Sequence, residues 1–472
     1  MNDQNRPQKD SFSRVVSVGV MVVFLLILLT PLALLCFNGE DQTVMEGEAR
    51  YTQPGFALGD FLRGDYQKEF ESWFSTRYPM RGEIVSAYRK LQYAADDLGF
   101  SVSALLPSQT PVDSTDTPAE TQPVDSYSDS NVLYTAMNKR LFEREAVEKA
   151  SYRGTEQVVI GKSGYLYENG YINEYYGLSP KYRDCSDEFL EERVQKLAEI
   201  QQMLAQRGIA FTLIITPSKA SEYARFIPDW YMAQNSLPED YVRPVTRLVP
   251  MLEDQGVHVI DSASYFDEIG LDETFPLTGI HWSKPAAYEA TRALMQSYES
   301  QSGRKVRNLL AYNLTVSGYK TPGYGNSETD IFGVAYSGLP ESLAVKDDFY
   351  YWPELTVENP NGGSVDVLIQ GGSFCWDFKY YMQTYGLCDN FRQFYYNEWQ
   401  EDDWTDPRLM GEEAWGPILD SVDYVVMECN EQYVCMMGTE PPRWGAADRE
   451  PLGDDRWDVY ESLHRYLQDT TP

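Results

Sequence analysis

Histidine and net positive charge are both scarce in this chain. Only 3 of its 472 residues are histidine, and 39 Lys and Arg stand against 72 Asp and Glu, which gives a formal net charge of -33. A chain this acidic repels phosphate backbones and anionic lipid headgroups, so we expect no nucleic-acid partner. Because there are only three histidines, few residues are candidates for a histidine general base.

Cysteine is sparse as well, and its spacing is not that of a metal site. Five cysteines follow Cys36, namely Cys185, Cys375, Cys388, Cys429 and Cys435. No Cys-x-x-Cys or Cys/His pattern indicates zinc, and the sequence predicts neither a metal nor a cofactor. Outside the cytoplasm an odd count leaves at least one thiol free or paired between chains. Disulfides such as Cys429–Cys435 or Cys375–Cys388 stay open.

Long hydrophobic runs are absent except for one, from Val15 to Phe37. Its 23 residues fit the ~20 that a helix needs to span a bilayer. Arg6, Lys9 and Arg14 precede it and acidic residues follow it, so the positive-inside rule places residues 1–14 in the cytoplasm and the rest outside. No small-x-small cleavage pattern follows. The run therefore predicts an uncleaved signal anchor and a single-pass protein of the cell membrane.

The rest of the chain divides by composition. Residues 38–106 read as a helical stalk, because apolar residues recur at helical spacing between Gly59 and Gly99. Residues 107–131 are rich in Pro, Ser, Thr and Asp and predict a disordered linker. Residues 132–472 then form the extracytoplasmic domain. Aromatics make up 14% of the chain, and such faces suit both sugar rings and ordinary cores.

Within 132–472, helical and strand-like segments alternate. Ser186 to Arg207 carries apolar residues at helical spacing, and the strand-like run Ile209 to Thr216 follows at once. Further strands are expected at Val257–Asp261, Val365–Gln370 and Tyr424–Glu428, and further helices at Pro285–Gln301, Asp377–Tyr385 and Asp455–Gln468. Strands separated by helices predict an α/β domain with a mostly parallel sheet covered on both faces.

A candidate nucleophile follows one of these strands. The apolar run that begins at Val367 leads into Gly371, Gly372 and Ser373 just before a predicted helix. A glycine turn between a strand and a helix exposes a serine, and the N–H groups at the helix start can hold an oxyanion. A serine that merely caps the helix would give the same pattern.

A serine nucleophile needs a base, and there are three histidines to consider. His258 lies in a strand-like segment and is expected to be packed in the core or at a sheet edge. His464 lies among charged residues of the C-terminal helix and is expected to be solvated. His281 lies on a loop just before a helix that Ser283 caps, where a general base is accessible. A structural, hydrogen-bonded histidine is the alternative.

Taken together, the motifs resemble a known family. They are ESWFSTRYPMRGEI (Glu71–Ile84), VVIGKSGYLYENG (Val158–Gly170), TLIITPSKASEY with Lys219, TGIHWS with His281 and Trp282, GGSF with Ser373, and VDYVVMECNE with Glu428. In this order, with the histidine motif before the serine motif, the chain resembles the alginate O-acetyltransferase-like (DHHW-type) branch of the SGNH hydrolase superfamily.

The resemblance carries several implications. It implies a Rossmann-like SGNH α/β/α sandwich and O-acetylation of an extracellular or cell-wall polysaccharide through an acyl-serine intermediate. Ser373 would be the nucleophile and His281 the base, with Gly371, Gly372 and Phe374 forming the turn and the oxyanion site. It also implies a membrane-bound O-acyltransferase partner as acyl donor and a polysaccharide acceptor.

The chain departs from the family pattern at Gly279, where the family has the Asp that orients the catalytic histidine. Asp272, Glu273 or Glu428 could replace that acid, His281 could act in a dyad, or the site could be inactive. Gly372 likewise stands where Asp is common, with the turn preserved. Lys219 either lies near the site or is simply solvated.

Two rival functions therefore stay open beside acetyl transfer. One is a carbohydrate acetylesterase that uses the same residues with water as the acceptor. The other is a non-catalytic polysaccharide-binding or assembly protein that keeps the fold, a reading to which the glycine at position 279 lends weight.

Overall fold

The computed structural model describes residues 130–147, 157–235, 237–317, 350–395, 412–437 and 459–470, together with Tyr66, Gly154, Ile331 and 398–399. The chain separates into two compact units, and apart from Tyr66 the described residues belong to the unit formed by Gln92–Pro442 and Pro451–Pro472. The predicted anchor, most of the stalk and the linker up to residue 129 lie outside the described residues. Within the described ranges, no helix is both long and apolar enough to cross a bilayer.

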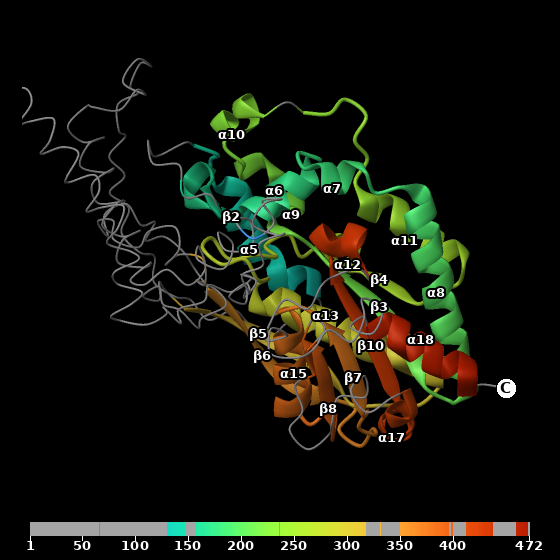
Figure 1. Ribbon diagram of the computed structural model, residues 1–472. Coiled ribbons are helices and arrows are strands. Elements are labelled where there is room, and N and C mark those ends of the chain that lie inside the picture. The colour runs from blue at the N-terminus through green and yellow to red at the C-terminus, as the bar shows by residue number, and fades with distance from the viewer. Residues whose placement is uncertain are drawn as a thin grey trace, which may run out of the picture. The chain divides into compact units, whose positions relative to one another are not determined.

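A six-stranded sheet forms the centre of the described unit (Figure 1). Its order is β4-β3-β10-β7-β8-β9, with bounds Val259–Asp261 (β4), Ala210–Thr216 (β3), Tyr424–Asn430 (β10), Val367–Gly371 (β7), Phe391–Tyr395 (β8) and Glu398–Trp399 (β9). The first five strands are parallel, and β9 runs antiparallel to β8. The predicted mostly parallel sheet is confirmed. Strand β10 is buried throughout, as expected of a strand that helices cover on both sides.

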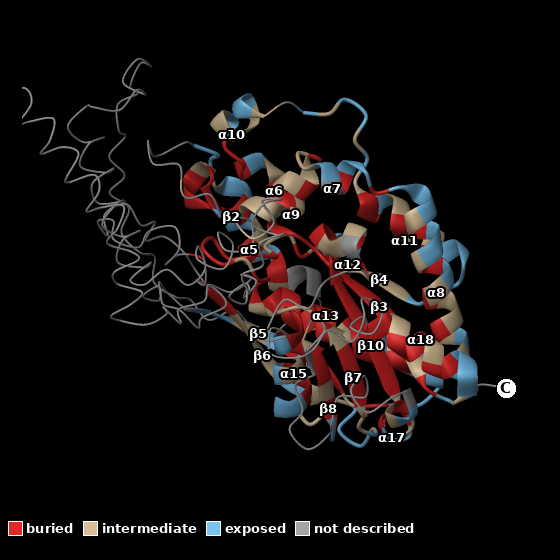
Figure 2. Cartoon of the chain, in the orientation of Figure 1, coloured by how far each residue is buried: buried red, intermediate tan, exposed pale blue. Residues whose placement is uncertain are grey.

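Helices cover both faces of this sheet (Figure 1). On one face lie α12 (Ser262–Ile269), α13 (Lys284–Ser302) and α15 (Cys375–Thr384), and on the other α8 (Asp187–Gln206), α11 (Pro244–Asp254), α17 (Trp415–Leu419) and α18 (Val459–Thr470). Side chains of a strand alternate between faces, so Ile214 packs in the first core and Leu213 and Ile215 pack in the second. Figure 2 shows that the central strands are largely buried and that the helices around them carry both buried and exposed residues. The α/β sandwich is confirmed.

Helix α8 shows how the sequence sets these layers. The Ser186 side chain caps the helix by accepting a hydrogen bond from the Phe189 N–H at 3.2 Å. Its buried residues, Leu190, Val194, Leu197, Ile200 and Leu204, recur every three or four positions. The chain then turns at Gly208, whose φ of 76° favours glycine, and enters β3.

Smaller elements complete the described unit. They are α5 (Ser130–Glu143), β1 (Val158–Ile160), η2 (Lys162–Gly164), β2 (Leu166–Glu168), α6 (Asn169–Tyr175), α7 (Pro180–Arg183), α9 (Lys219–Glu222), η3 (Ala224–Phe226), α10 (Asp229–Gln234), η5 (Glu412–Ala414) and η6 (Glu431–Met436). An antiparallel ribbon of β5 (Asn308–Ser317) and β6 (Tyr350–Glu358) was not expected from the sequence. Helix α5 begins at Ser130, inside the predicted linker.

The two remaining histidines bear differently on their sequence-based expectations. His258 lies at the sheet edge, one of the two places expected for it, just before the edge strand β4, and it is exposed rather than packed. His464 is 8% exposed, and its Nε2 lies 2.7 Å from Glu199 Oε2. The expectation of a solvated His464 was wrong because α18 packs against α8, which brings Glu199 to it across the fold. None of the five described cysteines forms a disulfide.

Candidate active site

The candidate site lies at the carboxyl edge of the sheet, where the direction of the connections reverses. The connection after β3 leads to β4 on one side, and the connection after β7 leads to β8 on the other, with β10 between them. Open parallel sheets bind ligands at such a switch point, beyond the carboxyl ends of the strands. Ser373 follows β7 and Lys219 follows β3, so both residues lie at this edge.

The serine turn is built from a strand end and a helix start. Strand β7 ends at Gly371 and α15 begins at Cys375, whose N–H donates to the Gly372 carbonyl at 3.1 Å. A Cβ on Gly371 would lie 2.5 Å from Glu428 Cβ, so only glycine fits there. The turn leaves Ser373 partly exposed beside the helix N-terminus.

The His281 loop brings its imidazole directly to this turn. His281 Nε2 lies 2.6 Å from Ser373 Oγ, although the two residues are 92 positions apart. The imidazole is 4% exposed and contacts the Phe374 ring, with centroids 5.2 Å apart. A hydrogen bond of this length is what a general base needs to take the serine proton.

Lys219 holds the loop that carries His281. Its side chain is fully buried, and Nζ donates to the carbonyl oxygens of Leu277 at 2.9 Å and Gly279 at 2.6 Å. The alternative of a solvated lysine is therefore wrong, because the backbone of the loop replaces the solvent around the ammonium group. At Gly279, where the family has an acidic side chain, this chain uses the backbone carbonyl to bind a cation.

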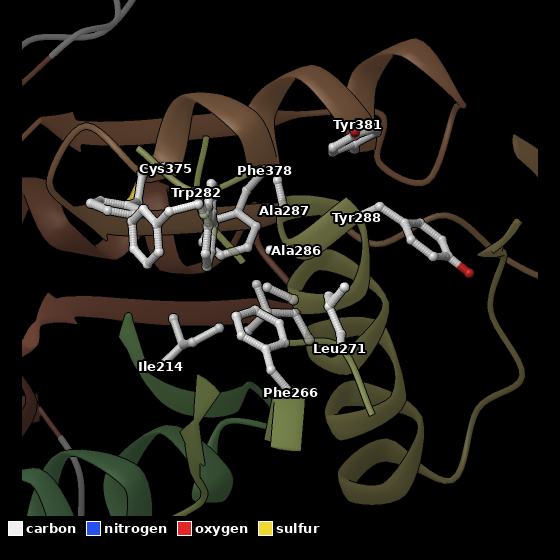
Figure 3. Close-up of a cluster of buried hydrophobic side chains, with 14 of the residues drawn as sticks. Ile214, Phe266, Leu271, Trp282, Ala286, Ala287, Tyr288, Cys375, Phe378 and Tyr381 are labelled. Carbon is white, nitrogen blue, oxygen red and sulfur yellow. The ribbon is translucent and has the colours of Figure 1, made fainter. Parts of the chain in front are cut away.

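Trp282 joins the histidine loop to the serine helix. Its Nε1 donates to Asp377 Oδ2 at 3.0 Å, and Lys284 Nζ lies 2.5 Å from Asp377 Oδ1. The indole is fully buried and packs edge-on against Phe374 and Phe378, with centroids 5.0 and 5.4 Å away. Figure 3 shows Trp282 and Phe378 in this cluster beneath α15. The loop and the helix are thus packed as one unit.

Glu428 lies under the serine turn from the neighbouring strand β10. One carboxylate oxygen accepts the Gly372 N–H at 2.6 Å, and the other accepts Thr216 Oγ1 at 2.5 Å. Burial raises the pKa of the Glu428 carboxyl, while these hydrogen bonds, the Cys375 thiol and the charge of His281 lower it. The Gly372 N–H thus supports the turn through Glu428 and does not point to an open oxyanion site.

Two other backbone groups are better placed to bind an oxyanion. Within the described part of the chain, neither the Ser373 N–H nor the Phe374 N–H forms a hydrogen bond. Both precede α15, whose N-terminus favours negative charge. Phe374 was expected from the sequence in this role, whereas Ser373 was expected only as the nucleophile.

The remaining acidic candidates lie on the loop before the histidine. The backbone N–H of Asp272 donates to Asn138 at 3.0 Å, and the carbonyl of Glu273 accepts from Ser283 at 3.1 Å. Burial and the neighbouring Asp267 raise the pKa of Asp272. The Glu428 carboxyl lies instead under the serine turn, and burial, the largest effect on it, raises its pKa.

Sequence reasoning missed three residues that support this site. Thr216 donates to Glu428, and Asp377 links Trp282 to Lys284. The position of Thr216, as the last residue of a strand that ends at the binding edge of the sheet, was the one available signal. Asp377 and Lys284 gave none, because their pairing joins residues 93 positions apart.

Comparison with known proteins tests the resemblance independently. Residues 158–322 match a family model described as an SGNH hydrolase-like domain, acetyltransferase AlgX. The predicted resemblance is confirmed. The matched segment contains Lys219 and His281 and ends before Ser373. No curated protein matches the chain.

Solved structures of similar proteins were also found. The O-acetyltransferase domain of Pseudomonas putida AlgJ is 18% identical, with 61% of this chain and 96% of that chain covered at a TM-score of 0.39. Pseudomonas aeruginosa AlgX is 12% identical (62% and 71% covered, TM-score 0.35). Bacillus cereus PatB1 with a sulfonyl adduct is 11% identical (59% and 97% covered, TM-score 0.38). These scores are too low to carry an argument about this chain.

Proposed function

We propose that this protein is an O-acetyltransferase that modifies hydroxyl groups of an extracellular or cell-wall polysaccharide. The observation that carries the proposal is the 2.6 Å contact between Ser373 Oγ and His281 Nε2 at the carboxyl edge of the sheet. The match of residues 158–322 to an acetyltransferase family model favours acyl transfer over other serine chemistry.

In the first half-reaction, Ser373 Oγ attacks the carbonyl carbon of the acyl donor while His281 Nε2 takes its proton. The oxyanion that forms is bound by the N–H groups of Ser373 and Phe374 at the start of α15. The charged imidazole then gives its proton to the leaving group as the bond to the donor breaks. The product is an acyl ester on Ser373.

In the second half-reaction, a sugar hydroxyl attacks the acyl-serine. His281 takes the proton of the hydroxyl, the same two N–H groups hold the oxyanion, and the proton returns to Ser373 Oγ as the ester leaves. Glu428 supports both steps from under the turn, because its carboxyl accepts the Gly372 N–H and so holds Ser373 in place for attack.

The proposal includes the membrane context predicted from residues 15–37. An uncleaved anchor there would keep the Ser373 site close to the bilayer, within reach of a membrane-bound O-acyltransferase that supplies the acyl group. The donor is inferred from the family resemblance alone.

The direct test is a strain in which Ser373→Ala replaces the native chain. We expect polymer-bound acetate to be lost, with the protein still present in the membrane at its normal level. Ser364→Ala is the matched control, because Ser364 is a surface serine bound to Asp389, and it should leave acetate unchanged. Unchanged acetate in the Ser373→Ala strain would contradict the proposal and favour a binding or assembly role.

The acetyl acceptor, sugar or water, distinguishes a transferase from an esterase. Purified full-length protein is given a model acetyl ester together with a soluble polysaccharide, and acetate released to water is compared with acetate transferred to sugar. Transfer should exceed release. Release far above transfer would favour a carbohydrate acetylesterase with the same residues.

A further inference from the structure

Helix α15 presents two different faces, and the outer one is aromatic. Trp376 and Tyr380 are 43% and 49% exposed, whereas Asp377, Phe378 and Tyr381 between and beside them are buried. Trp376 is the one exposed tryptophan among residues whose burial the structure describes. Large exposed apolar side chains that lie together indicate a binding surface rather than chance.

This outer face is continuous with the nucleophile. Ser373, Trp376 and Tyr380 stand at i, i+3 and i+7, which places them along one side of a helix, and the Trp376 N–H donates to the Ser373 carbonyl at 3.2 Å. With a rise of about 1.5 Å per residue, Tyr380 lies about 6 Å beyond Trp376 along the axis. The two rings therefore extend away from Ser373 in a row.

A third ring and a cation complete this surface. Tyr395, the last residue of β8, lies beside Trp376 with ring centroids 5.5 Å apart and planes inclined by 46°. Lys379 Nζ lies 5.7 Å from the centre of the Trp376 ring. The surface thus offers flat apolar faces with polar rims, next to a partly exposed serine.

We propose that Trp376, Tyr380 and Tyr395 form an aromatic platform that binds the acceptor across Ser373, and that this acceptor is an uncharged polysaccharide. The inference rests on the proposed acetyl transfer and names its acceptor. Sugar rings present C–H groups on their faces and hydroxyls at their edges, so they stack on Trp and Tyr faces while the edges stay hydrated. Stacking along a row also tolerates sliding, which suits modification at many points of one chain.

The negative charge of the protein favours an uncharged polysaccharide over an acidic one. With a formal net charge of -33, the protein repels a chain that carries a carboxylate on every sugar. Among the described residues, Lys379 is the cation that lies over a platform ring, and its ammonium also lies 5.9 Å from the Phe391 ring, so it offers a single charge there. An uncharged polymer meets the same rings without that repulsion.

The test measures binding without turnover. Full-length Ser373→Ala protein in detergent is titrated by calorimetry with a soluble neutral glucan and with a polyuronate of matched length. The same titrations follow with Trp376→Ala, Trp376→Phe and Tyr380→Ala added. Phe142→Ala is the control, because Phe142 is 61% exposed on α5 and outside the platform. Thermal unfolding of each variant confirms that it is folded.

We expect the neutral glucan to bind the Ser373→Ala protein, and Trp376→Ala to raise its Kd at least tenfold. Trp376→Phe should raise it less, and Phe142→Ala should leave it unchanged. The inference is overturned if Trp376→Ala binds glucan as tightly as its parent, if the polyuronate binds as well as the glucan, or if Trp376→Ala instead releases a co-purifying membrane protein. Acetate in the Ser373→Ala strain decides the proposed function separately from this result.

Discussion

The two faces of the central sheet bury different types of side chain. The core beneath α8, α11 and α18 is mainly aliphatic, with Leu204, Leu248 and Leu252 fully buried. The core beneath α13 and α15 also encloses charged groups, among them Lys219 and Glu428. Burying such groups costs free energy unless each one is hydrogen-bonded.

The buried charged groups lie at the candidate site. On the α8 face, the helices pack on the sheet mainly through apolar side chains, whose burial contributes about 25 cal/mol per Å². On the α15 face, Lys219 bonds to the loop that carries His281, Glu428 bonds to the turn that carries Ser373, and Trp282 bonds from the histidine loop to Asp377 of α15. Matched substitutions on the two faces should therefore separate activity from stability.

The largest effect is expected for Lys219→Met. It leaves the carbonyls of Leu277 and Gly279 without their donor, so the His281 loop shifts, and a shift of about 1 Å can cost about 100-fold in rate. The control is Lys196→Met on α8, which removes an ion pair with Glu461 on the other face and should leave the rate unchanged. Acetyl transfer per folded molecule measures both. An equal loss of transfer rate in both variants would contradict the distinction between the two faces of the sheet.

The next effect compares two buried tryptophans. Trp282→Phe removes the donor to Asp377, and Trp415→Phe removes an equivalent 2.9 Å hydrogen bond to Ser462 on the other face. Each should lower the free energy of unfolding by about 1–3 kcal/mol, because a buried acceptor loses its partner. Denaturant unfolding measures this free energy. Transfer rate should fall about tenfold in Trp282→Phe alone, and a similar fall in Trp415→Phe would refute the distinction.

A smaller effect is expected for Glu428→Gln. The amide keeps the shape and can still accept the Gly372 N–H, but its single oxygen cannot also accept the Thr216 hydroxyl, so the serine turn is held less firmly. We expect the rate constant to fall several-fold, with little change in the KM for the acceptor. Glu289→Gln is the control, since Glu289 is also buried but bonds to Tyr134 instead of the turn. If Glu289→Gln slows transfer as much, Glu428 has no special role.

The smallest effect concerns pH and Glu222, which accepts Thr274 Oγ1 at 2.8 Å on the histidine loop. Burial raises the pKa of Glu222 to about 8. Because the folded protein then holds a proton that the unfolded chain releases near pH 4.5, stability falls as pH rises from about 5 to 8. The Tm of Glu222→Gln should fall less than that of the wild type over this range, with a difference of about 2–4 °C between the two falls. Glu253→Gln, at an exposed position, should follow the wild type, and a parallel course for Glu222→Gln would contradict the assignment.

Much of the fold was predictable because its strongest signals are local. Helix α8 was predicted from the spacing of its apolar residues, and β3 and β10 from their continuous apolar runs, each within two residues of the observed ends. The β5–β6 ribbon was missed, since its pairing joins segments that are distant in sequence. His464 was misread because its partner Glu199 lies 265 positions away.

The candidate site was predictable in part for a related reason. Ser373 was found from its glycine turn and His281 from the scarcity of histidine, and the structure places both side chains in contact. The roles of Lys219, Asp377 and Thr216 depend on contacts across the fold, which no local pattern encodes. The bond from Lys219 to the Gly279 carbonyl is such a case, because it joins a side chain after β3 to the backbone of a loop 60 positions away.

Trapping of the acyl intermediate shows whether Ser373 carries the acyl group with His281 as its base. Full-length protein is mixed with an activated acetyl ester without acceptor, quenched, digested and analysed by mass spectrometry. We expect an acetyl group on the Ser373 peptide of the wild type, and its absence in Ser373→Ala and His281→Ala. Acetylation at another residue, or equal labelling of Ser373 in His281→Ala, would contradict it.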